Sequence, residues 1–123
     1  VVYLVTRDET RHVTFGVNYL EEYVKTLSEE ERDERAQFAY EACAISRERL
    51  VATDVFRYFG WDVEEARKKV LDGFVMSTFR NLLFQRVIPN LKRIGLLTEK
   101  VRPKFETLGI LDYENLATDG DID

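Results

Sequence analysis

One pair of residues near the start of the chain has the types and the spacing of metal ligands. Glu9 precedes His12 by three residues, and His12 is the single histidine of the sequence. On a helix, side chains at positions i and i+3 point the same way. A carboxylate can bridge or chelate iron, and a neutral imidazole supplies one nitrogen donor. A Glu-x-x-His pair that projects into a helical bundle is half of what a carboxylate-bridged site for two iron or manganese ions requires.

The surrounding residues predict that this pair lies on the inward face of a long amphipathic helix. The apolar stripe that contains Glu9 and His12 also holds Val2, Val5, Gly16, Leu20, Tyr23 and Leu27. The opposite stripe is polar and holds Arg7, Arg11, Thr14, Asn18, Glu22 and Lys25. Buried carboxylates and imidazoles need partners, so two interpretations stay open: metal ligation, or a Glu–His hydrogen bond in a packed core. Core packing is also the better interpretation for Tyr3, Tyr19 and Tyr23.

The remaining sequence predicts an all-α fold of three long helices and one short helix. Ser28 with Glu31, and Asp62 with Glu65, have the spacing of capping boxes and mark two helix starts. Pro89 lacks a backbone N–H and predicts a kink or break in the third helix. The expected helices cover residues 1–27, 28–59, 62–95 and 98–108, followed by an acidic tail.

Composition restricts the class of protein. The 123 residues suit one domain, residues 1–123, and a net charge of −5 disfavours non-specific binding to nucleic acid. No apolar run approaches the roughly 20 residues that cross a bilayer. The one cysteine, Cys43, excludes an internal disulfide and a cysteine-based zinc cluster. It also fits a reducing compartment, and we expect a cytoplasmic protein.

The string from Asp8 to Gly16, DETRHVTFG, resembles the last metal-binding helix of the ferritin-like superfamily. The resemblance is closest to the branch that includes the ribonucleotide reductase small subunit and related ligand-binding oxidases. It implies a four-helix bundle that holds two metals with four carboxylates and two histidines. Glu9 and His12 would be the fourth-helix ligands, and Asp8 would orient a ligand histidine by a hydrogen bond.

Residues 80–113 resemble the C-terminal extension of uncharacterised bacterial ferritin-like proteins. By this resemblance the chain lacks three helices that would precede Val1, together with four of the six ligands. The chain also opens on VVYLV without a capping residue, so we expect it to be the C-terminal part of a longer protein. Two iron or manganese ions are expected in the complete protein, and none bound stoichiometrically by these 123 residues alone.

The resemblance implies an O2-dependent oxidoreductase that acts on a small organic substrate with an electron donor. Two alternatives stay open: an iron-handling ferritin-like protein without an organic substrate, and a non-catalytic helical scaffold. We also expect a homo-oligomer, such as a dimer, because a partial bundle exposes apolar faces that associate. The faces expected to associate carry Val2, Val5, Leu20 and the region 74–84.

Overall fold

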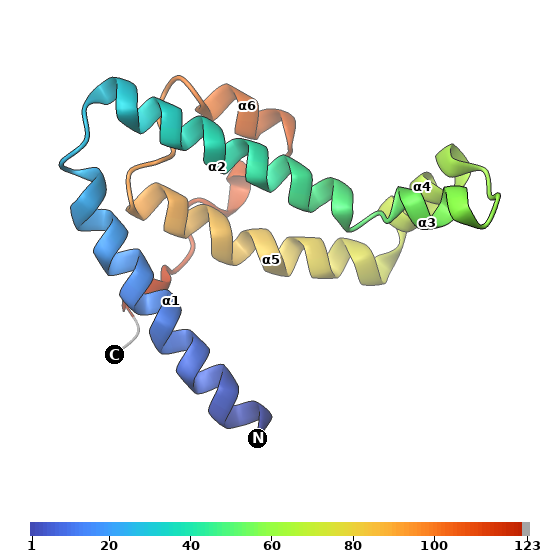
Figure 1. Ribbon diagram of the computed structural model, residues 1–123, viewed down its shortest axis with the longest axis horizontal. Helices are drawn as coiled ribbons and strands as arrows, with labels where there is room; N and C mark the ends of the chain where they lie inside the picture. The colour runs from blue at the N-terminus through green and yellow to red at the C-terminus, as the bar shows by residue number, and fades with distance from the viewer. Residues whose placement is uncertain (122–123) are drawn as a thin grey trace.

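The computed structural model describes residues 1–121, and every regular element in that range is helical, which confirms the all-α prediction (Figure 1). Three helices are long and three are short. The long helices are α1 (Val2–Val24), α2 (Glu29–Arg49) and α5 (Phe74–Arg93). The short ones are α3 (Thr53–Tyr58), α4 (Val63–Asp72) and α6 (Arg102–Thr107), and two 3-10 turns follow, η1 (Leu111–Tyr113) and η2 (Asp119–Asp121).

Local capping chemistry fixes two helix starts where the sequence predicts them. The Ser28 side chain accepts a hydrogen bond from the backbone N–H of Glu31, and the Glu31 carboxylate accepts one from the N–H of Ser28. The Asp62 side chain likewise accepts from the N–H of Glu65 at 2.8 Å. Each bond satisfies a backbone donor that the first helical turn leaves without a partner.

Two predicted helices are interrupted, so their expected extents are wrong. The helix that starts after Ser28 ends at Arg49, because Ala52 adopts a left-handed conformation with φ 53°. The helix expected over 62–95 is divided at Gly73, which has an extended conformation with φ −67° and ψ 133°. Of the kink or break expected at Pro89, the break is wrong, since α5 continues past it to Arg93, and the kink stays a prediction.

The hydrophobic core lies between α2, α5 and the segment that follows α5. Its buried members are Ala36, Cys43, Phe84, Ile88, Val101, Phe105 and Ile110. The chain reverses at Gly95, whose φ of 86° is in the region that favours glycine. This reversal brings α6 back onto the core, where Phe105 packs edge-on against Tyr40 with ring centroids 5.7 Å apart.

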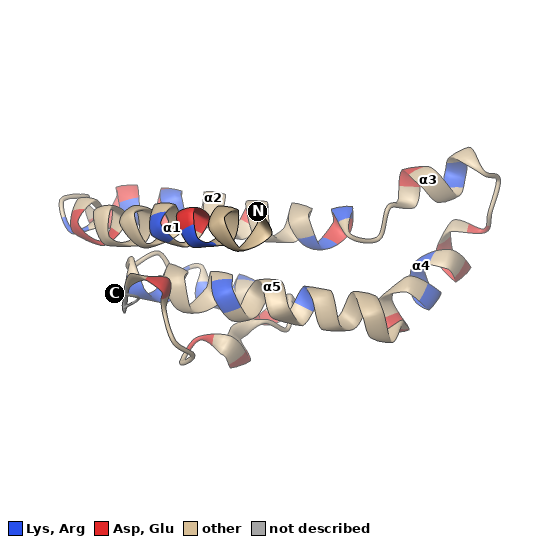
Figure 2. Ribbon diagram, turned by 90° about the horizontal axis from the view of Figure 1, so that it is seen from below, with Lys and Arg blue, Asp and Glu red and all other residues tan. Residues whose placement is uncertain are grey.

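The outline of the molecule is extended rather than round. Figure 2 shows α1 and α2 at one level and α5 at another, with α3 and α4 projecting beyond one end of the α2–α5 pair. Near the other end α1 is connected to α2, and its N-terminal half points away from the rest of the chain (Figure 1). Within the described residues, no helix is both long and apolar enough to cross a membrane.

Candidate functional site

Helix α1 carries all three residues of the sequence-predicted site, and it is the most exposed of the long helices. Only Val17 and Val24 are buried along its length. The apolar side chains of its N-terminal half are open to solvent: Val2 is 80 % exposed and Val5 is 54 % exposed. The predicted site therefore lies in the N-terminal half of a helix whose buried residues are both in its C-terminal half.

Glu9 and His12 lie next to each other, as their spacing predicts. The Nδ1 atom of His12 is 3.6 Å from Oε2 of Glu9, and the two side chains are 75 % and 68 % exposed. This separation suits an ion pair when the imidazole is protonated. Because both side chains are largely exposed to solvent, neither needs a further hydrogen-bond partner from the protein.

Asp8 turns toward arginines instead of toward the histidine. Its Oδ1 atom lies 3.5 Å from Nε of Arg7 and 3.9 Å from Nη1 of Arg11. The side chain is also more than half exposed. In this structure Asp8 therefore balances local positive charge, and its expected contact with a ligand histidine stays a prediction.

The expected inward orientation of the Glu9–His12 stripe is wrong with respect to the described chain. The part of α1 that meets the rest of the molecule includes Thr14, which donates to the backbone carbonyl of Asp119 at 2.8 Å. It also includes Asn18, whose side-chain oxygen accepts from Arg93 at 3.1 Å. Both belong to the stripe that the sequence predicts to be solvated. Helix α1 packs through the buried Val17 and Val24 together with these polar side chains, whereas Val2, Val5 and Leu20 of its apolar stripe are exposed.

The tyrosines of α1 share this exposure, so the expectation that they pack in the core is wrong. Tyr3 is 76 % exposed, Tyr19 59 % and Tyr23 45 %. Phe15, Tyr19 and Tyr23 instead form a ladder of stacked rings along the helix, with successive centroids 6.1 and 6.4 Å apart. The outward surface of α1 is therefore rich in aromatic and aliphatic side chains around one acid and one imidazole.

The described residues supply no complete metal site. Within residues 1–121, no three or more His, Cys, Asp or Glu side chains gather closely enough to hold an ion. Glu48 is bound by the Arg67 guanidinium, whose hydrogen bonds hold the pKa of that carboxyl below its ordinary value. Burial raises the pKa of the Cys43 thiol to about 11, so it stays protonated at neutral pH.

One carboxylate that the sequence analysis overlooks is the most buried charged group of the described chain. Asp119 is 4 % exposed and lies in the acidic tail, which gives no sequence signal for burial. Arg86 and Asn90, both on α5, contact its two oxygens. The backbone carbonyl of Asp119 lies 2.8 Å from the Thr14 hydroxyl of α1, although Asp119 is outside the predicted ligand set.

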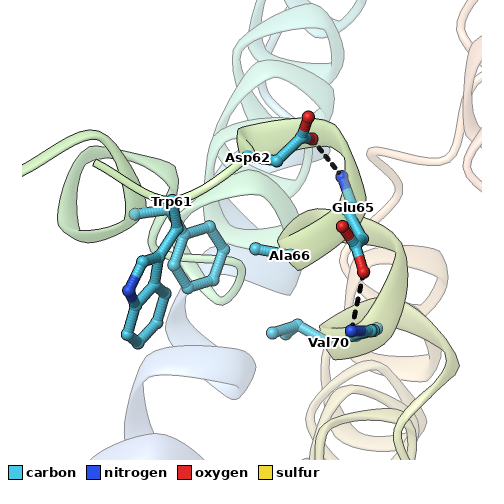
Figure 3. Close-up of a pocket in the computed structure, with 7 residues that line it drawn as sticks. Trp61, Asp62, Glu65, Ala66 and Val70 are labelled. Atoms are coloured by element: carbon cyan, nitrogen blue, oxygen red, sulfur yellow. Dashed lines mark hydrogen bonds and ion pairs between the residues drawn. The ribbon is translucent and has the colours of Figure 1, made fainter. Parts of the chain in front are cut away.

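A separate pocket of about 390 Å³ opens between α3 and α4 (Figure 3). Its apolar wall includes Phe56 and Trp61, whose rings stack with centroids 6.0 Å apart. Its acidic groups are already engaged, since Asp62 caps α4 and Glu65 pairs with Lys69 at 2.8 Å. The pocket contains none of the residues of the predicted site.

Comparisons of the chain with protein-family models, with curated proteins and with solved structures give no match.

Proposed function

We propose that α1 is a ligand-bearing helix of a carboxylate-bridged two-metal site, and that this chain is the C-terminal part of a ferritin-like oxidoreductase. One observation carries the proposal: Glu9 and His12 are adjacent on an apolar helix stripe whose N-terminal half no described residue covers. Apolar stripes of this kind are normally covered by other helices. A carboxylate and an imidazole at the centre of such a stripe are the donors that a helix of this type contributes to iron or manganese.

The proposal assigns a role to each side chain. Glu9 would supply carboxylate oxygen and His12 an imidazole nitrogen to the metals, and Asp8 would orient a ligand histidine. The metal pair, when bound, supplies the capacity to reduce O2 and oxidise an organic substrate. The covering helices supply the other ligands and remove water from the stripe.

A second candidate function is a non-catalytic helical scaffold, and the Glu9–His12 contact is also compatible with it. Glu9 and His12 satisfy each other while both remain largely exposed, so the pair requires neither a metal nor burial. The two candidates differ in whether the protein consumes oxygen in the presence of ferrous iron.

We would measure oxygen uptake by the full-length protein after anaerobic loading with ferrous iron. The proposal predicts iron-dependent uptake that His12→Ala abolishes and Arg11→Ala leaves intact, since Arg11 lies one position away with its side chain 71 % exposed. Uptake that stops once the added iron is oxidised would favour the iron-handling alternative. Catalytic uptake with an electron donor would favour the oxidoreductase, and no uptake at all would contradict both in favour of the scaffold.

A further inference from the structure

Residues 118–121, here called the C-terminal strap, lie between α1 and α5 (Figure 1). The strap is anchored to α5 through Asp119. The side-chain amide of Asn90 donates to Oδ2 of Asp119 at 2.6 Å, and the backbone N–H of Asp119 donates back to Oδ1 of Asn90 at 2.9 Å. Arg86 binds the other carboxylate oxygen. Charge-assisted bonds to a group that is 4 % exposed make this a strong and directional attachment.

The other side of the strap is attached to α1. The Thr14 hydroxyl donates to the backbone carbonyl of Asp119 at 2.8 Å. Arg93 connects all three segments, because its guanidinium donates to Thr118 of the strap at 2.7 Å and to Asn18 and Glu21 of α1 at 3.1 and 3.3 Å. The strap therefore lies between α1 and α5, whose direct hydrogen bonds to each other include those from Arg93 to Asn18 and Glu21.

Gly120 shows how closely the strap fits. A Cβ atom added there would lie 2.4 Å from Cζ of Arg93 and 2.7 Å from the side-chain oxygen of Asn18. Separations this short do not occur between packed atoms, so the arginine or the helix would have to move. The space between Arg93 and Asn18 therefore admits the backbone of Gly120 but no side chain at this position.

We propose that the C-terminal strap fixes the position of α1 on α5, and that Asp119 is its positioning residue. The N-terminal half of α1 has no other support in the described chain, since its side chains through Val13 are exposed apart from a partly buried Thr10. Thr14, the contact point, is two residues after His12. The strap therefore controls where Glu9 and His12 lie relative to the core. Its consequence for a metal site rests on the function proposed above, whereas the mechanical role does not.

The test is a distance measurement in the metal-free 123-residue chain. Spin labels would replace Val5 on α1 and Thr78 on α5, both exposed, in a Cys43→Ala background, and pulsed electron double resonance would be recorded in spin-diluted samples. The proposal predicts one narrow distance distribution for the parent chain and loss of the narrow peak in Asp119→Ala. Asp119→Asn, which keeps one carbonyl oxygen as an acceptor, should recover part of that peak.

Two further variants make the result decisive. Asp112→Ala changes an exposed aspartate of the same C-terminal region and should leave the distribution narrow. Thr14→Val removes the hydroxyl that lies 2.8 Å from the strap carbonyl of Asp119 and 2.9 Å from the Thr10 carbonyl of its own helix. It should broaden the distribution while circular dichroism shows helix content unchanged. If Asp119→Ala proves unfolded, Thr14→Val alone decides. A narrow distribution in folded Asp119→Ala or in Thr14→Val would overturn the proposal.

The strap and the proposed function can fail separately. A parent protein that binds no iron leaves the distance result intact and removes only the metal assignment. Conversely, a full-length protein that binds iron equally well with Asp119→Ala and with the parent sequence contradicts the positioning of the site by the strap.

Discussion

Two carboxylates of this protein meet opposite environments, and each environment explains what the side chain does. Glu9 remains largely in water, where its contact with His12 contributes little to stability because water screens exposed pairs. Asp119 is buried, and its charge is balanced by Arg86 and by hydrogen bonds from Asn90. Removing the partners of a buried carboxylate is costly, whereas separating an exposed pair is not. Glu9 and His12 are therefore available for a ligand, and Asp119 is committed to the fold.

Two phenylalanines of α5 give a matched test of the core. Phe84 is 1 % exposed and Phe74 is 83 % exposed. Phe84→Ala should lower the free energy of unfolding by about 3–5 kcal/mol, because it removes buried area and leaves a cavity. Phe74→Ala should change it by less than about 0.5 kcal/mol. Chemical denaturation of both variants is the measurement, and equal losses would contradict the assigned core.

The ion pair between Glu114 and Arg102 predicts that the stability of the protein depends on pH. Hydrogen bonds from Arg102, at 2.6 and 3.2 Å, lower the pKa of Glu114 below its ordinary value of 4.5. A lowered folded-state pKa stabilises the protein above the unfolded-state pKa, and the benefit disappears as pH falls through the folded-state pKa. The stability advantage of the parent over Glu114→Gln should thus be constant at neutral pH and shrink below about pH 4.5.

Urea denaturation of both proteins between pH 3 and pH 7 would measure this advantage. Glu30→Gln is the control, because Glu30 is an exposed glutamate of α2. An advantage of Glu114 that grows as the solution becomes more acidic would contradict the ion pair.

At the scale of the elements, the sequence predicts where helices start better than where they are interrupted. Capping at Ser28 and Asp62 is a local interaction between a side chain and the nearby backbone, so its pattern is visible in the sequence. The break at Ala52 has no such signal, since alanine favours helices and nothing in its side chain marks a left-handed conformation. The amphipathic pattern of α1 likewise identifies an apolar stripe but not the body that covers it. This is why the candidate pair was predicted correctly as neighbours and incorrectly as inward-facing.

The left-handed Ala52 predicts an unusual gain from glycine. Ala52→Gly should raise the free energy of unfolding by about 0.5–1 kcal/mol, because relief of the strain exceeds the entropy that glycine costs. Ala44→Gly, in the interior of α2, should lower it by about 1 kcal/mol. Thermal unfolding followed by circular dichroism distinguishes the two, and a loss at both positions would show that the Ala52 turn is not strained.

At the scale of the whole molecule, many large apolar side chains are exposed to solvent instead of packing in the core. Besides the stripe of α1, the N-terminal half of α5 exposes Phe74, Val75 and Phe79, each by more than half. We expect self-association of the chain at micromolar concentration through these faces. Multi-angle light scattering should show a dimer or larger species.

Val5→Lys should shift that equilibrium toward the monomer, because it places a charge in the α1 stripe. Val55→Lys is the matched control, since Val55 lies on α3 with a similar exposed fraction, 47 % against 54 % for Val5. A monodisperse monomer of the parent chain, or an equal effect of both lysines, would contradict association through α1.

The central claim, that Glu9 and His12 are metal ligands, is tested most directly by the metal content of the full-length protein. The protein would be purified without a metal-affinity tag, loaded anaerobically with ferrous iron, freed of excess metal and analysed by mass spectrometry. We predict about two metal ions per chain for the parent. His12→Ala should lose at least one of them, since no other histidine in these 123 residues can replace it, and Arg11→Ala should retain both. A parent protein that stays metal-free, or a His12→Ala variant that binds as much iron as the parent, would contradict the account.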